Sequence, residues 1–168
     1  MKLKNALRCA PSPIQFVFAL ADHQTSHVLP HPHVSRVVRS SDADDVTVVA
    51  AGITLHEAIA AADELAKGNI AVRVIDLYSV KPVDVETLRA AAAATDAIVT
   101  VEDHWPEGGI GDAVVEALAD AENRPRVHKL AVRNMPGSGT PRELLHVAKI
   151  DNAAIVEAAV RSLVRVHD

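Results

Sequence analysis

Short apolar runs alternate with longer amphipathic runs over most of this chain, and this alternation is the strongest constraint on its fold. Residues 46–51 are rich in valine and form a run too short for a helix, which is typical of a strand buried on both faces. Residues 55–66 place apolar side chains at helical spacing, and Gly68 follows as a stop signal. Strand and helix repeated in this way predict parallel strands joined by right-handed crossovers. The expected fold is therefore α/β, with three layers (α/β/α) and an open, mostly parallel sheet.

The alternation of strands and helices continues along the rest of the chain. Strands are predicted at residues 70–75, 97–101 and 127–132. Helices are predicted at residues 84–94, 111–121 and 151–166, and a further helix is predicted to begin at Thr140. In the helix after Gly111, the spacing places Val114, Val115 and Leu118 toward the core.

Polar residues mark where these helices begin. Thr54 and Glu57 stand in the spacing of a capping box, in which each side chain satisfies a free amide of the first turn. Asp84 is a candidate N-cap. Thr140 and Glu143 repeat the capping-box spacing with a proline between them, so this helix start is also predicted.

A change of composition near residues 40–45 divides the chain. We predict an irregular, unassigned N-terminal segment over residues 1–43 and an α/β domain over residues 44–168. Four histidines of the first segment lack the Cys or carboxylate partners of a metal site, so we interpret them as part of a solvated arm; they are His23, His27, His31 and His33. The apolar run 14–21 is too short to span a membrane and follows two prolines, which argues against a signal peptide.

Charge and cysteine content exclude several functions. A net charge of -5 and a pI near 6.0 do not favour nucleic-acid binding, which needs clustered lysine and arginine. The single Cys9 cannot form an internal disulfide, and no Cys/His spacing indicates zinc. We therefore expect a cytoplasmic protein with neither a membrane nor a nucleic-acid partner.

The segment after the third predicted strand is the leading candidate for a site, because ligands of open α/β sheets bind beyond the carboxyl ends of the strands. Glycines at a helix start let backbone amides face an anion, and acidic residues with a histidine could serve as acid and base. The candidate residues are Glu102, Asp103, His104, Gly108, Gly109 and Gly111. Close helix packing explains the same glycines, so we assign no catalytic residue and expect an anion-binding turn or a subunit contact.

Other chemical motifs are missing or weak. The glycines do not form a dinucleotide fingerprint or a P-loop, and Ser138 lacks a nucleophile elbow because Pro136 precedes it. Residues 135–141 are interpreted as a turn leading into a helix cap. Tyr78 and Trp105 follow predicted strands, where exposed aromatic side chains indicate a docking surface.

Four motifs in order resemble the C-terminal domain of transketolase over residues 44–168. They are Val-Thr-Val-Val-Ala-Ala-Gly-Ile-Thr-Leu-His-Glu-Ala at 46–58, Val-Ile-Asp-Leu-Tyr-Ser-Val-Lys-Pro-Val-Asp at 74–84, Val-Glu-Asp-His with Glu-Gly-Gly-Ile-Gly at 101–111, and Ser-Gly-Thr-Pro-Arg-Glu-Leu-Leu at 138–145. Part of this pattern is also similar to 1-deoxyxylulose-5-phosphate synthase and to the β subunit of 2-oxo acid dehydrogenases. The first and last motifs most resemble transketolase.

The resemblance implies a domain that builds the subunit and a homodimer contact, while other domains hold thiamine diphosphate and Mg²⁺. We therefore expect no cofactor-binding and no metal-binding residue in this chain: Gly111 and Asp112 are followed by Ala113, whereas the metal motif of thiamine enzymes begins Gly-Asp-Gly. Residues 1–43 contain no counterpart of the Leu-Ser-Arg-Gln stretch that helps to bind substrate phosphate. The expected partner is a transketolase N-terminal chain with the thiamine sites, and the expected reaction of the assembly is two-carbon ketol transfer between sugar phosphates.

Three interpretations remain open. The chain is either such an enzyme part, inactive alone, or a non-catalytic module that binds an anion or a partner at the glycine turn. A truncated product without activity is the third interpretation.

Overall fold

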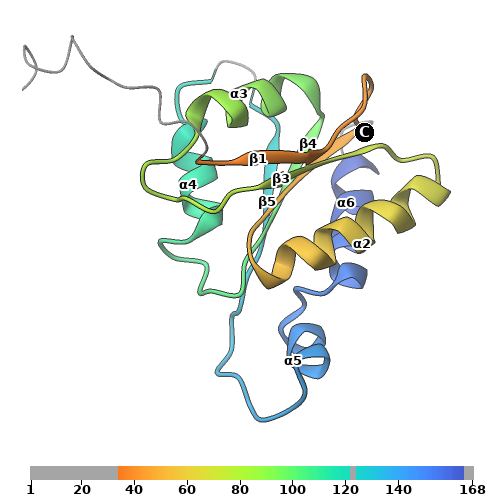
Figure 1. Cartoon of the computed structure of the whole chain (residues 1–168), viewed down its shortest axis with the longest axis vertical. Coiled ribbons are helices and arrows are strands. Elements are labelled where there is room, and N and C mark those ends of the chain that lie inside the picture. Colours follow the sequence, from red (N-terminus) through yellow and green to blue (C-terminus); the bar gives the residue numbers. More distant parts are fainter. Residues whose placement is uncertain (1–33, 122–123, 165–168) are drawn as a thin grey trace, which may run out of the picture. The chain divides into compact units, whose positions relative to one another are not determined.

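A computed structural model describes residues 34–121 and 124–164 of the chain (Figure 1). The predicted histidine-rich arm and the apolar run 14–21 lie outside the described residues. The division at residue 44 stays a prediction, but Arg36–Arg39, which the sequence analysis left unassigned, forms a strand.

The described elements alternate along the chain as the sequence predicts. In order they are β1 (Arg36–Arg39), β2 (Val46–Ala50), α2 (Ile53–Lys67), β3 (Val72–Asp76), α3 (Val85–Ala94), β4 (Ala97–Val101), α4 (Ile110–Ala117), β5 (Arg126–Leu130), α5 (Pro141–Ala148) and α6 (Asn152–Val164). The sheet order is β1-β3-β2-β4-β5. Strands β3, β2, β4 and β5 are parallel, and β1 joins β3 in the antiparallel direction. The predicted α/β fold with a mostly parallel sheet is confirmed.

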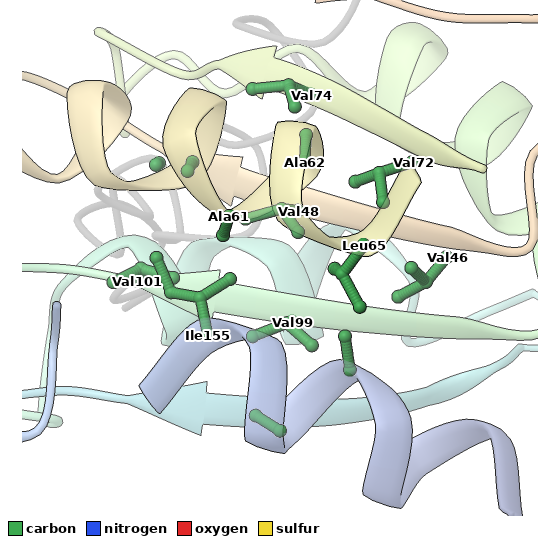
Figure 2. Close-up of a cluster of buried hydrophobic side chains, with 14 of the residues drawn as sticks. Val46, Val48, Ala61, Ala62, Leu65, Val72, Val74, Val99, Val101 and Ile155 are labelled. Carbon is green, nitrogen blue, oxygen red and sulfur yellow. The ribbon is translucent and has the colours of Figure 1, made fainter. Parts of the chain in front are cut away.

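Helices cover both faces of the sheet. Helices α2 and α6 pack on one face, where small alanines such as Ala58 and Ala158 let the helix backbones approach the valines of β2 and β4. Figure 2 shows this layer, with Leu65 of α2 and Ile155 of α6 directed toward the strand valines. Helices α3 and α4 bury Leu88 and Val114 against the opposite face. The central strands β2 and β4 are buried along their full length, which explains why each is apolar except for one threonine.

Two expectations about helices were wrong. Helix α2 begins after Gly52, and no side chain caps it. The Thr54 hydroxyl instead donates to the carbonyl oxygens of Ala51 and Val101, both at 2.9 Å, and the Glu57 carboxylate accepts from the amide of Asn152 at 2.8 Å. Both side chains thus contact residues that are far away in the sequence, Val101 and Asn152. Val115, predicted to face the core, is 39% exposed, because the core side of α4 is formed by Ile110, Val114 and Ala117.

The other helix starts agree with the sequence. The Asp84 carboxylate accepts from the amide of Thr87 at 3.0 Å, and Thr140 and Glu143 form the predicted capping box of α5. None of the described helices is both long and apolar enough to cross a membrane.

Candidate functional site

The buried carboxylate of Glu102 organises the turn at the end of β4. Its residue is only 2% exposed, and its backbone amide donates to Leu130, which extends the ladder between β4 and β5 by one bond. Its two side-chain oxygens accept from the first amides of α4: Oε2 from Ile110 at 2.6 Å and Oε1 from Gly111 at 3.1 Å. Because the first amides of a helix lack partners within the helix and carry partial positive charge, a carboxylate is well stabilised there.

Glycine is required at this turn for two reasons. A Cβ atom on Gly109 would come within 1.7 Å of Glu102 Oε2, and Gly108 has a φ of +73°, which side chains rarely tolerate. Gly111 passes close to Lys129, whose Cε atom would lie 2.4 Å from an added Cβ. The glycines therefore let the carboxylate and the lysine approach the backbone.

A second acidic residue closes the turn from outside. One Asp112 oxygen accepts from the Gly108 amide at 2.6 Å, and the other accepts from Lys129 Nζ at 2.6 Å. The same ammonium donates to the carbonyl oxygen of Pro106 at 2.8 Å. The hydrogen bond from Lys129, followed by that from Gly108, holds the pKa of Asp112 below its ordinary value. This pair could not be predicted from the sequence, because an acidic residue in a first helical turn gives a signal but its partner on β5 does not.

Asp103 and His104 do not join Glu102 in a catalytic arrangement. Both are exposed, and His104 Nδ1 lies 2.8 Å from the carbonyl oxygen of Trp105. The His104 carbonyl oxygen accepts from the amide of Val132. The six predicted residues therefore lie on one turn. Their polar atoms mainly form hydrogen bonds with the backbone of that same turn and do not converge on a shared site. An external anion at the amides of Ile110 and Gly111 would have to displace the Glu102 carboxylate.

An apolar groove of about 590 Å³ opens beside this turn. Trp105, Ile53 and Met135 line it and are 44%, 44% and 83% exposed. Helix α5 forms another wall through Leu144. Tyr78 is 51% exposed elsewhere on the domain. The interpretation of the two aromatic side chains as a docking surface stays a prediction.

The turn over residues 135–141 leads into a cap, as the sequence predicts. The Glu143 carboxylate accepts from the amide of Thr140 at 2.8 Å, and the Thr140 hydroxyl accepts from the amide of Glu143 at 3.4 Å. Accepting from Thr140 also lowers the pKa of Glu143. These contacts begin α5, which Figure 1 shows apart from the other helices.

The described residues offer no suitable donor set for the metal of a thiamine cofactor. No group of three or more His, Cys, Asp or Glu residues within residues 34–121 and 124–164 could hold a metal ion. Asp112, which follows Gly111 in the Gly-Asp pair, is engaged by Lys129 and Gly108. The contacts of Glu102, Asp112 and Lys129 instead join β4, α4 and β5.

Comparison with known families gives one consistent result. Residues 35–155 match the family described as the transketolase C-terminal domain. Transketolase-like protein 1 of Bos taurus is 51% identical over 132 residues, which are 78% of this chain and 22% of that protein. The transketolase of Mus musculus is 49% identical over 131 residues, or 77% of this chain and 21% of that protein. The chain thus spans about a fifth of the length of these relatives.

Solved structures agree. A split-gene transketolase, an inactive beta4 tetramer, superimposes with a TM-score of 0.71 and 37% identity, covering 77% of this chain and 42% of that chain. A transketolase variant of Pichia stipitis has a TM-score of 0.59 at 16% identity over 78% of this chain and 18% of that chain, which supports the fold alone.

Proposed function

The chain belongs to the family of transketolase C-terminal domains, and we propose that it is the C-terminal part of a transketolase whose thiamine-binding domains lie on another chain. In that assembly, two-carbon ketol units pass between sugar phosphates, as in the pentose phosphate pathway. This chain alone is not expected to be active. A cytoplasmic location is part of the same proposal.

The observation that carries this proposal is the identity to one part of transketolases, together with the likeness to a split-gene transketolase. About half of the aligned residues are identical to transketolases and transketolase-like proteins, yet the match spans only about a fifth of their length. The split-gene structure supports a transketolase built from more than one chain. Thiamine diphosphate with Mg²⁺ would supply the carbanion chemistry. Because the described residues do not fit that cofactor, we assign none of them to it.

The proposed role of this domain is to support the assembly. Glu102 fixes the turn between β4 and α4, and Lys129 ties the same turn to β5. A rigid turn of this kind can present Trp105 and the apolar groove to another chain without losing conformational freedom on binding. We also propose that this domain takes part in a homodimer contact between two copies of the assembled enzyme.

Reconstitution tests the proposal. The purified chain is mixed with a chain of the same organism that carries the thiamine-binding domains, together with thiamine diphosphate and Mg²⁺. Ketol transfer from xylulose 5-phosphate to ribose 5-phosphate is then measured, and complex formation is followed by size-exclusion chromatography with light scattering. We expect a complex and turnover that neither chain gives alone.

A pair of variants locates the contact. Trp105→Ser removes a groove side chain, whereas Val115→Ser removes a comparably exposed apolar side chain on α4. We expect the first variant to weaken the complex at least about tenfold and the second to leave it unchanged. Absence of both complex and turnover with the unaltered chain would refute the proposed function, while equal effects of the two variants would refute only the position of the contact.

A further inference from the structure

A second groove, of about 510 Å³, lies between β5, the loop over residues 131–137, α5 and α6. We call it the basic groove, because three of its exposed side chains are Arg133, Lys149 and Arg161. We propose that the basic groove binds a phosphate monoester whose carbon body lies on its apolar wall. This proposal does not depend on ketol transfer, although the basic groove shares Val132, Met135 and Leu144 with the neighbouring apolar groove.

The charges of the groove suit a dianion. Arg133, Lys149 and Arg161 bring three positive charges, and Glu157 brings one negative charge, which leaves a net charge of +2 in a chain whose overall charge is -5. Lys129 also lines the groove, but its ammonium is already paired with Asp112. A phosphate monoester carries a charge of about −1.5 to −2 at neutral pH, so its charge matches that of the groove.

The three cations differ in how far they are engaged. Arg161 donates to Glu157, and Arg133 donates to the carbonyl oxygen of Lys129 at 3.4 Å, which leaves most guanidinium N–H groups for a ligand. Lys149 forms no ion pair with any other residue in the described part of the chain. Arginine can engage phosphate oxygens in pairs, and lysine adds a point charge.

The backbone at Lys149 is a second, independent observation. Lys149 has a φ of +57° at the end of α5, a conformation that costs free energy for residues with a Cβ atom. Asn69 adopts a similar φ of +59° after α2, but asparagine tolerates this conformation well. A lysine at such a position is less favourable for folding than an asparagine, and Lys149 is one of the residues that line the groove. We infer that the lysine serves binding rather than stability.

The apolar wall defines the rest of the ligand. Leu130 at the end of β5, Val132 two residues later, Leu144 of α5 and Ala158 of α6 also line the groove. A volume of this size is within the range of small-molecule sites, and inorganic phosphate would fill only a small part of it. We therefore expect the ligand to carry an apolar or aromatic group beyond its phosphate.

The basic groove is also a better anion site than the glycine turn. The amides of Ile110 and Gly111 already donate to the Glu102 carboxylate, so an anion there would compete with a buried internal charge. In the basic groove, the Lys149 ammonium has no such internal competitor among the described residues.

Titration calorimetry of the full chain tests the proposal. The probes are the monoesters phenyl phosphate and adenosine 5′-monophosphate. Inorganic phosphate, which lacks the carbon body, and adenosine, which lacks the phosphate, are the controls. We expect at least one monoester to bind with a Kd below about 1 mM, at least about tenfold more tightly than either control, because charged hydrogen bonds and apolar contact act together. The proposal is overturned if neither monoester binds, or if inorganic phosphate binds equally well.

Variants assign the binding to the groove. Lys149→Asn and Arg133→Gln are each expected to weaken monoester binding about tenfold or more, since each removes a charged contact. Lys67→Gln is the control, because Lys67 lies at the end of α2 and does not line the groove. Equal weakening by the control would indicate a general charge effect and overturn the proposal.

Stability separates binding from a structural role. Asparagine tolerates the positive φ, so Lys149→Asn should leave the melting temperature unchanged or raise it while binding is lost. A fall in melting temperature together with unchanged binding would show that Lys149 only ends α5. Arg133→Gln, on an exposed loop, provides the same binding measurement independently.

Discussion

The carboxylate of Glu102 lies so close to the backbone of Gly109 that a Cβ atom on residue 109 would come within 1.7 Å of Oε2. Both residues are buried, and the carboxylate is fixed by the amides of Ile110 and Gly111. The side chain therefore cannot withdraw without leaving two amides unpaired.

The first prediction concerns this close approach. Gly109→Ala should destabilise the protein by about 2–3 kcal/mol, because either the carboxylate or the helix start must shift. Urea unfolding followed by circular dichroism measures the change. Gly137→Ala is the control, since a Cβ there meets nothing within 4 Å and no positive φ is required. Comparable losses in the two variants would contradict the explanation.

The second prediction concerns the carboxylate itself. Glu102→Ala should lower the free energy of unfolding by about 2–4 kcal/mol, because two amides lose a charged acceptor in a buried position. Glu102→Gln should cost less, since its carbonyl oxygen can still accept. Glu107→Gln on the exposed part of the same turn should change the free energy by less than about 0.5 kcal/mol. If Glu102→Gln and Glu102→Ala are equally stable to urea, charge and not hydrogen bonding dominates.

The sequence predicted elements where the signal is local or runs through the whole element. Residues 97–101 were predicted as a strand and form β4 with the same bounds, because a strand buried on both faces is mostly apolar, and only Thr100 departs from that pattern here. Asp84 and Thr140 were predicted as caps, and the amides that donate to them, those of Thr87 and Glu143, lie three residues further along the chain. At these positions the neighbouring residues in the sequence were sufficient to predict the structure.

Contacts between distant segments could not be predicted. The partners of Thr54 and Glu57 include Val101 and Asn152, so a correct capping-box spacing gave a wrong cap. β1 is a short edge strand with arginines at both ends, and it gave no apolar pattern. At the turn, the sequence identified Glu102 and the glycines but not their relationship. That relationship requires the pairing of β4 with β5 and the position of Lys129.

The third prediction is a pH dependence at the start of α3. Burial acts to raise the pKa of Asp84, but hydrogen bonds from Thr87 and Ser35 outweigh it and hold the pKa below its ordinary value. A lowered folded-state pKa stabilises the protein above the unfolded-state value, and this stabilisation is lost as pH falls through the folded-state value. Asp84→Asn retains a good cap and should flatten the loss of stability below about pH 4. Thermal melts across this range compare it with Asp42→Asn, an exposed reference that should retain the original slope.

The fourth prediction concerns α5, a helix in which no residue is fully buried. The capping box should therefore contribute much of its local stability, about 1 kcal/mol. Thr140→Ala should speed amide hydrogen exchange in α5 about fivefold while exchange in β2 and β4 is unchanged. Ser138→Ala, on the exposed preceding turn, should leave exchange in α5 unchanged. Faster exchange throughout the sheet would show that α5 is coupled to global unfolding.

The fifth prediction compares two ion pairs that differ in burial. Asp44 has a side chain only 1% exposed and accepts from Arg73 Nε at 3.0 Å, as well as from the amide and hydroxyl of Ser41. Asp44→Ala leaves a half-buried guanidinium without its carboxylate, so the free energy of unfolding should fall by about 3 kcal/mol. Asp63→Ala breaks the exposed pair with Arg39 and should cost less than about 1 kcal/mol. Urea unfolding at low and high salt measures both, and only the exposed pair should weaken with salt, because water and ions reach it directly.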